Sequence, residues 1–331
     1  MKAVVHKDEP GFAGLMVTDM PEPITAKGTV KVKLKTVGIN HRDLFTLQRH
    51  RPEDPALIIG SDGAGVIVEV GDGVDNVQAG DEVVVIPSLR WQKNSPAPPA
   101  DFEILSLPDH GTFAEYIVLP AENVARKPSY MTWEESGVLT LAALTAYRVL
   151  FTRAKLEAGQ TVLIPGVGSG VVTLLMQMVK AVGARVIVTS RSDEKREKAL
   201  QLGADMAIDS GADWVEILKD EAIDIVIESV GAATWDKSLN QLKPGGTIAV
   251  FGASAGDVVQ LDLRKFFYGQ YNLLGSTLGS IEEAHEMLKF FETHKIKPVV
   301  DSVYSLSDAV SALKKIEHGG QFGKVALKVS E

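Results

Sequence analysis

Residues 161–191 decide the fold of this chain. They begin with TVLIPGVGSGVV (161–172), continue through an apolar segment of helical periodicity to Gly183, and end with RVIVTSR (185–191). Strand, glycine turn, helix and second strand at this spacing are typical of a dinucleotide-binding βαβ unit. Because Gly166, Gly168 and Gly170 carry no side chains, a pyrophosphate can lie close to backbone N–H groups at the positive end of the helix.

The end of the second strand indicates which dinucleotide is bound. An NAD-binding unit places a carboxylate about 20 residues after the glycines, where it accepts hydrogen bonds from the ribose. Ser190 and Arg191 stand at this place, and Lys195 follows one turn later, so the sequence favours NADP(H). The spacing departs from G-x-G-x-x-G, because the last glycine would fall on Val171. An ordinary tight turn is therefore the alternative interpretation.

The residues after this unit extend the same pattern. Apolar, β-branched segments follow at 224–231, 247–253 and 272–277, separated by segments of helical length and periodicity. Strands and helices that alternate in this way predict an α/β fold with a doubly wound parallel sheet covered on both faces.

Composition narrows the class of partner. A chain of 331 residues exceeds what one hydrophobic core usually serves, and 45% of its residues are apolar. The net charge of −9 argues against nucleic acid or an anionic membrane as the main partner and favours a small-molecule substrate. The most apolar long segment, 138–151, is short and carries Arg148, and no leader-like segment opens the chain, so we expect a cytoplasmic protein.

The chain contains no cysteine. Disulfides, thiolate nucleophiles and thiolate-ligated zinc are therefore excluded.

The residues before the nucleotide-binding segment have strand periodicity. TVKVKLKTV (29–37) alternates apolar residues with lysines, and further short apolar segments are punctuated by glycine. This predicts a mainly β domain, to which the C-terminal residues return. We expect one domain at 1–127 and 279–331 and a nucleotide-binding domain at 128–278.

Several segments resemble a known family when they are taken in order: VGINHRDL (37–44), IIGSDGAGVIVEVG (58–71), GDEVVV (80–85), GTFAEY (111–116), LTAYRVL (144–150), the glycine turn, LKPGGTIAVFG (242–252) and GKVALKV (323–329). The chain resembles the medium-chain dehydrogenase/reductases, in particular their zinc-independent quinone oxidoreductase and enone reductase branch. The resemblance implies a GroES-like catalytic domain, a Rossmann domain and a nicotinamide cofactor in the cleft between them.

The resemblance also locates the metal-ligand positions of the zinc-dependent relatives. Here those positions carry Asn40, Ser61 and Leu141, and the lobe that holds their structural cysteines corresponds to 87–111. Soft-ligand zinc chemistry is therefore excluded.

A different metal site is the remaining alternative. Its ligands would be His41, Asp43, Asp62 and His110, although no helical or hairpin spacing places them on one face. For Asp43 we favour a cap on the helix that follows over a role in proton transfer.

Hydride chemistry without a Lewis acid suits the β-carbon of an α,β-unsaturated carbonyl, because the charge then moves to oxygen, where hydrogen-bond donors stabilise it. The resemblance places Asn40 beside the nicotinamide ribose and the substrate. Phe45 stands where related enzymes have a tyrosine, so water, Tyr147 or His110 is the candidate proton donor.

The resemblance assigns the cofactor contacts as well. Thr145 is placed near the nicotinamide, and Ser169, Gly170 and Val171 at the pyrophosphate. Ser190, Arg191 and Lys195 are expected to hold the 2′-phosphate, the alternative being that RSDEKREK (191–198) is only a solvated face. The remaining contacts lie in loops around the cofactor: Ser229, Val230, Phe251, Gly252, Ala253, Leu278, Phe322, Gly323 and Lys324.

The segment 88–110 is long and irregular. It is either a lid that presents Trp91 and Phe102 to a flat conjugated substrate, or a rigid surface lobe.

The sequence thus predicts an NADPH-dependent reductase of quinones or α,β-unsaturated carbonyls. We expect a homodimer that pairs through the edge strand at 273–277. The alternatives are an alcohol dehydrogenase with a non-cysteine metal site and an NADP(H)-binding sensor without catalysis.

Overall fold

The computed structural model describes residues 1–329 and divides the chain into two compact units. The first unit comprises Met1–Leu144 with Gly279–Glu331, and the second comprises Thr145–Leu278. The sequence-based division assigned residues 128–144 to the nucleotide-binding domain, whereas the structure includes them in the first unit. The reason is that α2 (Trp133–Gly137) packs on strands of the first unit, and Thr140 binds the Asp62 side chain there.

The first unit is mainly β. Its elements are β1 (Lys2–His6), β2 (Leu15–Asp19), β3 (Thr29–Ile39), α1 (His41–Arg49), β4 (Leu57–Ile58), β5 (Asp62–Val70), β6 (Glu82–Val85), β7 (Ser88–Leu89), β8 (Glu103–Ile104), β9 (Tyr116–Pro120), β10 (Val124–Arg126), α2, the first part of α3 (Thr140–Tyr147), α9 (Ile281–His294), β17 (Val300–Ser305), α10 (Ala309–His318) and β18 (Lys324–Lys328).

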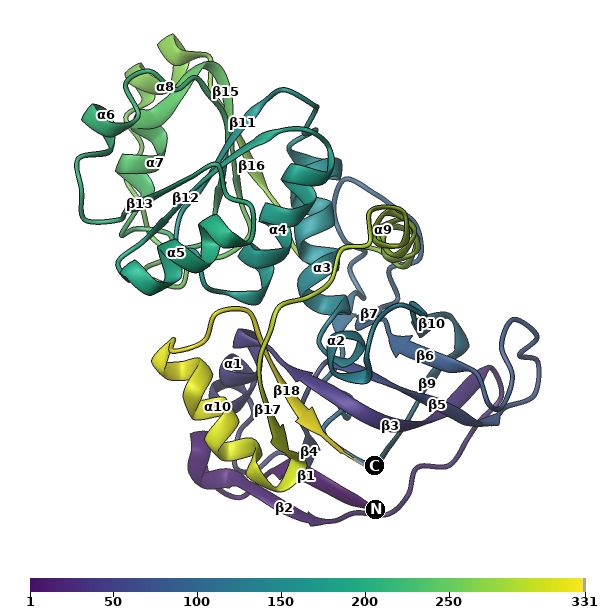
Figure 1. Ribbon diagram of the computed structural model, residues 1–331. Helices are drawn as coiled ribbons and strands as arrows, with labels where there is room; N and C mark the ends of the chain where they lie inside the picture. Colours follow the sequence, from purple (N-terminus) through teal and green to yellow (C-terminus); the bar gives the residue numbers. More distant parts are fainter. Residues whose placement is uncertain (330–331) are drawn as a thin grey trace. The chain divides into compact units, whose positions relative to one another are not determined.

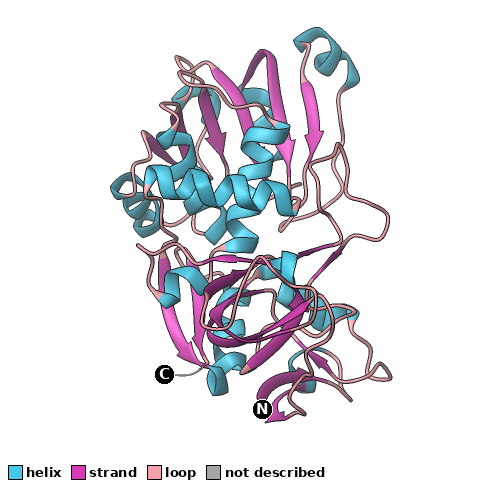
Figure 2. Ribbon diagram, turned by 90° about the vertical axis from the view of Figure 1, so that its right-hand side faces the viewer, coloured by secondary structure: helices cyan, strands magenta, loops and turns pink. Residues whose placement is uncertain are grey.

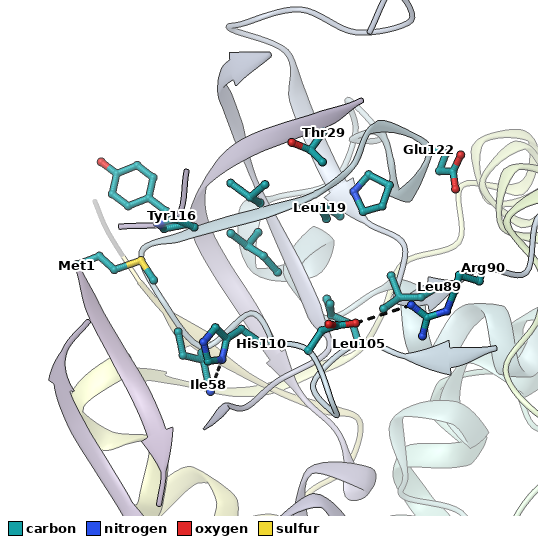
Figure 3. Close-up of a pocket in the computed structure, with 16 residues that line it drawn as sticks. Met1, Thr29, Ile58, Leu89, Arg90, Leu105, His110, Tyr116, Leu119 and Glu122 are labelled. Atoms are coloured by element: carbon teal, nitrogen blue, oxygen red, sulfur yellow. Dashed lines mark hydrogen bonds and ion pairs between the residues drawn. The ribbon is translucent and has the colours of Figure 1, made fainter. Parts of the chain in front are cut away.

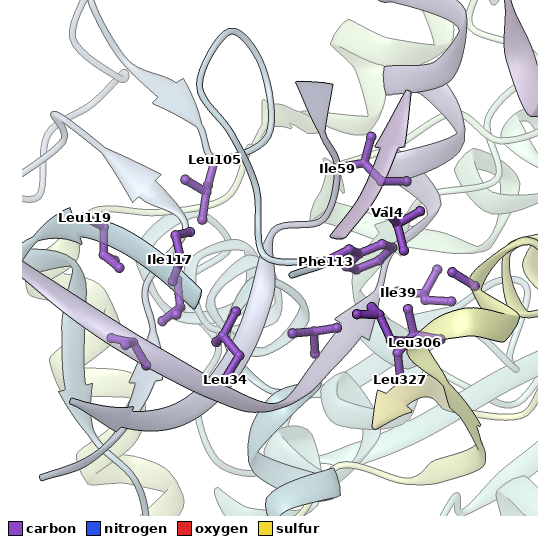
Figure 4. Close-up of a cluster of buried hydrophobic side chains, with 14 of the residues drawn as sticks. Val4, Leu34, Ile39, Ile59, Leu105, Phe113, Ile117, Leu119, Leu306 and Leu327 are labelled. Carbon is purple, nitrogen blue, oxygen red and sulfur yellow. The ribbon is translucent and has the colours of Figure 1, made fainter. Parts of the chain in front are cut away.

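A seven-stranded sheet forms the centre of this unit (Figure 1). Its order is β10-β6-β5-β3-β18-β17, with β9 pairing to β3. Val32 and Leu34 of the long strand β3 are buried in the core of this unit. Leu34 lies there with Phe113 and Leu327 (Figure 4). Strand β18 pairs antiparallel with β3. A strand that follows the second unit in the sequence therefore lies in the same sheet as strands that precede that unit.

The second unit alternates strands and helices. Its elements are β11 (Thr161–Ile164), α4 (Gly170–Ala181), β12 (Arg185–Ser190), α5 (Asp193–Gln201), β13 (Met206–Asp209), α6 (Trp214–Ile217), β14 (Ile223–Glu228), α7 (Trp235–Gln241), β15 (Leu242–Val250), α8 (Leu263–Gly269) and β16 (Asn272–Gly275). The predicted strands of this unit are confirmed, although β15 begins five residues earlier than expected.

All strand pairs of the second unit are parallel, in the order β13-β12-β11-β14-β15-β16. Helices α4 and α5 lie on one face and α6 to α8 on the other (Figure 1), and Figure 2 shows the strands of the sheet side by side. The order reverses between β11 and β14, and ligands of open α/β sheets bind where it does so, at the carboxyl ends of the strands. The α/β doubly wound fold predicted from the sequence is therefore confirmed.

No helix within residues 1–329 combines the length and the apolar character that crossing a bilayer requires.

Candidate functional site

The glycine turn joins β11 to α4. Gly166 and Gly168 adopt positive φ angles of 78° and 135°, a region in which other residues are strained. A Cβ atom on Gly168 would lie 3.0 Å from Lys195 Nζ, so this side chain reaches over the turn from α5. Ser169 caps α4, its side chain accepting the Val172 N–H at 3.2 Å. A helix N-terminus, an approachable backbone and an ammonium group thus meet at one place, which suits a phosphate.

Cationic side chains gather at the carboxyl end of β12. Arg191 is exposed, whereas Ser190 is buried and its Oγ accepts the Ser192 N–H at 3.2 Å. Arg196, which the sequence analysis missed, donates from Nη1 to the Ser190 carbonyl at 2.7 Å and pairs with Asp193. Arg196 belongs to the charged segment 191–198, but charge alone does not predict which of its cations contacts the end of β12.

The predicted positions after β14 and β15 lie in two joined loops. The Ser254 N–H donates to the Ser229 carbonyl at 3.1 Å, and the Phe251 N–H to the Glu228 carbonyl at 3.1 Å. Glu228, also missed, is fully buried, and its carboxylate accepts the Val230 N–H at 2.7 Å. An acidic residue as the last residue of a buried apolar strand was the available signal. The same loops contain the predicted positions Gly252 and Ala253.

A buried polar network lies in the first unit, where β3 ends and β5 and β18 begin. Asp62 is fully buried, and its Oδ1 accepts from Thr140 Oγ1 at 2.8 Å and from the Leu141 N–H at 2.7 Å. Its Oδ2 accepts from Asn40 Nδ2 at 3.0 Å and from Lys324 Nζ at 3.3 Å. Lys324 also donates to Asn40 Oδ1. The Asn40 amide, predicted to face the substrate, is therefore engaged with Lys324 and Asp62.

Helix α1 begins directly after this network. Asp43 Oδ2 accepts the Asn40 N–H at 2.8 Å, which confirms that Asp43 caps the helix. Its Oδ1 is buried and has no hydrogen-bond partner among the described residues. Burial raises the pKa of Asp43 to about 6, because the charged form loses its hydration.

We expect Asp43→Asn to remove one step from the pH dependence of folding. The pKa of Asp43 in the folded protein, about 6, exceeds its ordinary value of 3.8, so the folded state holds this proton more tightly. As the pH rises from 4 to 7, ionisation of Asp43 therefore lowers the free energy of unfolding by about 2 kcal/mol, whereas Asn has nothing to ionise. Urea unfolding at several pH values measures the difference. Asp75→Asn, at an exposed position, is the control, and parallel pH profiles for Asp43→Asn and the parent would contradict the expectation.

The predicted nicotinamide-proximal positions on α3 belong to the second unit. Thr145 is buried, and Tyr147 is partly buried. The Tyr147 ring lies 4.9 Å from the Phe151 ring, measured between centroids, and is tilted by 58°. The predicted position Leu278 is buried at the other end of this unit.

The predicted positions before β18 lie in a tight turn. Phe322 is buried, and its N–H donates to Asp301 Oδ1 at 2.9 Å. Gly323 has φ of 109°, and a Cβ there would lie 2.3 Å from the Val299 carbonyl oxygen. Glycine is therefore required at this position, which delivers Lys324 to the buried network.

His110 lies in a different part of the first unit. Its Nδ1 accepts the Ile58 N–H at 3.2 Å, and the side chain borders a cavity of about 390 Å³ over β9 (Figure 3). Leu105 and Leu119 also line this cavity, but Asn40 and Asp62 do not. The structure thus separates His110 from the network with which the sequence analysis grouped it.

The segment 88–110 is tied down rather than loose. Strand β7 pairs with β8, and the Trp91 side chain is fully buried, with its ring 5.2 Å from that of Phe102 and its Nε1 donating to Ser95 Oγ at 2.9 Å. Of the two interpretations of this segment, a lid that presents Trp91 to a substrate does not fit, because the indole is fully buried. The alternative interpretation, a rigid surface lobe, fits the structure.

Comparison with known proteins identifies the family. An alcohol dehydrogenase GroES-like domain matches residues 26–129, and a zinc-binding dehydrogenase domain matches residues 170–293. A zinc-type alcohol dehydrogenase-like protein of Schizosaccharomyces pombe is 33% identical, over 99% of both chains. The chain belongs to the medium-chain dehydrogenase/reductase superfamily.

Two further similarities extend this result. This medium-chain dehydrogenase/reductase is similar to a solved structure of an NAD-dependent alcohol dehydrogenase. The TM-score is 0.93 and the identity 35%, and the match covers 100% of each chain. A crotonyl-CoA reductase of Streptomyces avermitilis is 28% identical, over 99% of this chain and 88% of its own length. The chain is thus an oxidoreductase of this superfamily.

The side chains of this medium-chain dehydrogenase/reductase do not fit a catalytic zinc. Within residues 1–329, no three His, Asp or Glu side chains come together as ligands. Ser61 Oγ is bonded to Arg42 and the Leu105 carbonyl, and Asp62 is saturated by four donors, one of which is the Lys324 ammonium. A metal would have to displace this cation and would find neither imidazole nor thiolate.

Proposed function

We propose that this protein is a zinc-independent, NADPH-dependent reductase of α,β-unsaturated carbonyl compounds or quinones. The observation that carries the proposal is the Asn40, Asp62 and Lys324 network, in which a buried ammonium group lies among the side chains where a zinc enzyme needs metal ligands. Without a Lewis acid, an unactivated ketone is a poor acceptor, whereas a conjugated acceptor spreads the incoming charge to its oxygen.

The second unit offers the residues to hold the cofactor. Ser169, Gly170 and Val171 begin α4 and would bind the pyrophosphate through backbone N–H groups. Arg191 and Lys195 would bind the 2′-phosphate, since both are cationic and Ser190 brings no carboxylate to the strand end. When bound, the reduced nicotinamide supplies the hydride.

The similarity to a crotonyl-CoA reductase supports the substrate class. The name of that relative describes reduction of a conjugated thioester, in which a carbonyl activates the double bond. A carbonyl conjugated to the reacting carbon is also what a site without a metal needs, so chemistry and similarity favour the same class of acceptor.

Turnover by chelator-treated protein tests the proposal. We expect NADPH oxidation by an alkenal, a quinone and a conjugated thioester to persist after exhaustive treatment with a chelator, because no step requires a metal. Added Zn²⁺ should give no increase in kcat. A saturated ketone of similar size is the matched control and should not be reduced. The absorbance of NADPH reports the rate.

The alternatives give different results. Loss of activity on chelation, with recovery on addition of Zn²⁺, would establish the metal-dependent alcohol dehydrogenase instead. Tight NADPH binding without turnover of any acceptor would establish the non-catalytic sensor.

We further propose that the protein is a homodimer. Strand β16 is an edge of the six-stranded sheet, and Leu273 on it is 45% exposed. Phe267 and Tyr268 on the preceding helix α8 are also exposed. An apolar sheet edge favours pairing with a second copy of the same edge.

A further inference from the structure

Arg42 is held in a fixed position by the residue that replaces a zinc ligand. It lies in the first turn of α1, and its Nη1 donates to Ser61 Oγ at 2.5 Å and to the Leu105 carbonyl at 2.7 Å. Ser61 is fully buried and itself donates to the same carbonyl at 2.9 Å. These three contacts fix the guanidinium against Ser61, which directly precedes β5, and against the 88–110 lobe.

Much of the guanidinium remains available. A guanidinium has five N–H donors, and Nη1 accounts for two of them. Among residues 1–329, neither Nε nor Nη2 of Arg42 makes a hydrogen bond, and no carboxylate forms an ion pair with it. Burial lowers the pKa of Arg42, yet an arginine stays charged in any protein. The result is a partly desolvated cation with three unused donors.

We propose that Arg42 binds the carbonyl oxygen of the conjugated substrate and stabilises the enolate that forms there. This inference rests on the proposed function and narrows its substrate class to α,β-unsaturated carbonyl compounds. Arg42 thereby takes the part that a metal ion plays in a zinc enzyme, because a charged, pre-positioned donor is strongest where water is excluded.

The reaction balances as follows. A reduced nicotinamide nucleotide transfers a hydride to the β-carbon, and the electron pair of the carbon–carbon double bond moves through the α-carbon to the oxygen. The N–H groups of Arg42 hold this enolate oxygen, and the guanidinium keeps its protons. The α-carbon then takes a proton from water and the carbonyl re-forms. One enone, one reduced nucleotide and one proton give one saturated carbonyl and one oxidised nucleotide.

Substitution of Arg42 tests its role in turnover. We expect Arg42→Met to lower kcat/KM for an alkenal by about 10²- to 10³-fold, the usual loss when an oxyanion donor is removed. The NADPH dissociation constant and the thermal midpoint should remain near the parent values, since Arg42 is not among the expected cofactor contacts and its side chain makes only two hydrogen bonds within residues 1–329. Arg49→Met removes an exposed guanidinium from the same helix and should match the parent. Arg42→Lys keeps the charge without the fork, so it should recover only part of the loss.

A second readout does not depend on turnover. A nitrophenol has a flat conjugated ring, and its phenolate oxygen mimics the enolate. Protein saturated with NADP⁺ should bind the phenolate in preference to the phenol, which lowers the apparent pKa of the ligand and changes its absorbance. Both variants should weaken the preference for phenolate over phenol, and Arg42→Met should weaken it more than Arg42→Lys.

The outcomes separate the two proposals. Parent protein that reduces no conjugated acceptor overturns the proposed function, while the phenolate measurement still decides whether Arg42 receives an oxyanion. An active parent whose Arg42→Met variant keeps its kcat/KM within twofold overturns the inference alone. Parent protein that binds phenol and phenolate equally also overturns it, even if the variants fail to fold.

Discussion

Replacing Lys324 with Met is expected to lower the free energy of unfolding of the first unit by about 3–5 kcal/mol. The Lys324 ammonium is only 4% exposed and contacts both Asp62 Oδ2 and Asn40 Oδ1. Removal of the ammonium leaves the fully buried Asp62 carboxylate without a cation. Replacing the ammonium with water or with another side chain costs free energy. Urea unfolding measures the loss.

Two controls test this variant: one substitutes another lysine of β18, and the other also removes the charge of Asp62, the partner of Lys324. Lys328→Met removes an exposed ammonium from β18 and should change the free energy of unfolding by less than about 0.5 kcal/mol. The double variant Lys324→Met with Asp62→Asn should recover part of the loss, because no unpaired charge remains. Hydrogen exchange should increase in β3, β5 and β18 and not in the second unit. A loss under about 1 kcal/mol for Lys324→Met would mean that the pair does not stabilise the fold.

Removal of Arg191 and Lys195 together is expected to weaken NADPH binding by about 10³-fold. Each charge-assisted hydrogen bond to a phosphate contributes roughly 2 kcal/mol, which is about 30-fold in affinity. NADH lacks the 2′-phosphate, so its dissociation constant should change far less. Isothermal titration calorimetry with both nucleotides gives the two ratios.

Lys198→Ala is the matched control for the cofactor variant. Lys198 lies on the same helix α5 and pairs with Glu194 at 2.6 Å, one turn away from it. Lys198→Ala should bind NADPH like the parent if the loss of affinity comes from the cations at the end of β12 and not from the change in total charge. Parent protein that binds the two nucleotides equally would contradict the NADPH preference itself.

Local patterns made the second unit predictable from the sequence. Strand and helix periodicities repeat there at short range, and the glycines at 166 and 168 have the positive φ angles that only glycine adopts easily. Each signal lies within a few residues of the structure it specifies, so no long-range contact has to be known.

The polar contacts of the first unit were not predictable in this way. Lys324 and Asp62 are 262 positions apart, and only the pairing of β18 with β3 brings them together. The orientation of Arg42 depends on the Leu105 carbonyl, 63 positions away. For Trp91, the sequence left a lid and a rigid lobe as alternatives, and only the packing of its own lobe, which buries it, decides between them. Contacts of this kind follow from tertiary packing, which periodicity does not encode.

The position of β18 in the sequence determines the order in which the two units can fold during translation. The second unit is one continuous stretch of chain and can fold as soon as it emerges. The first unit cannot, because its central sheet and the counter-ion of Asp62 are complete only when β18, which follows the second unit in the sequence, has been synthesised. During synthesis, the second unit can therefore be folded while the first unit still lacks β18 and the Asp62 carboxylate still lacks its cation.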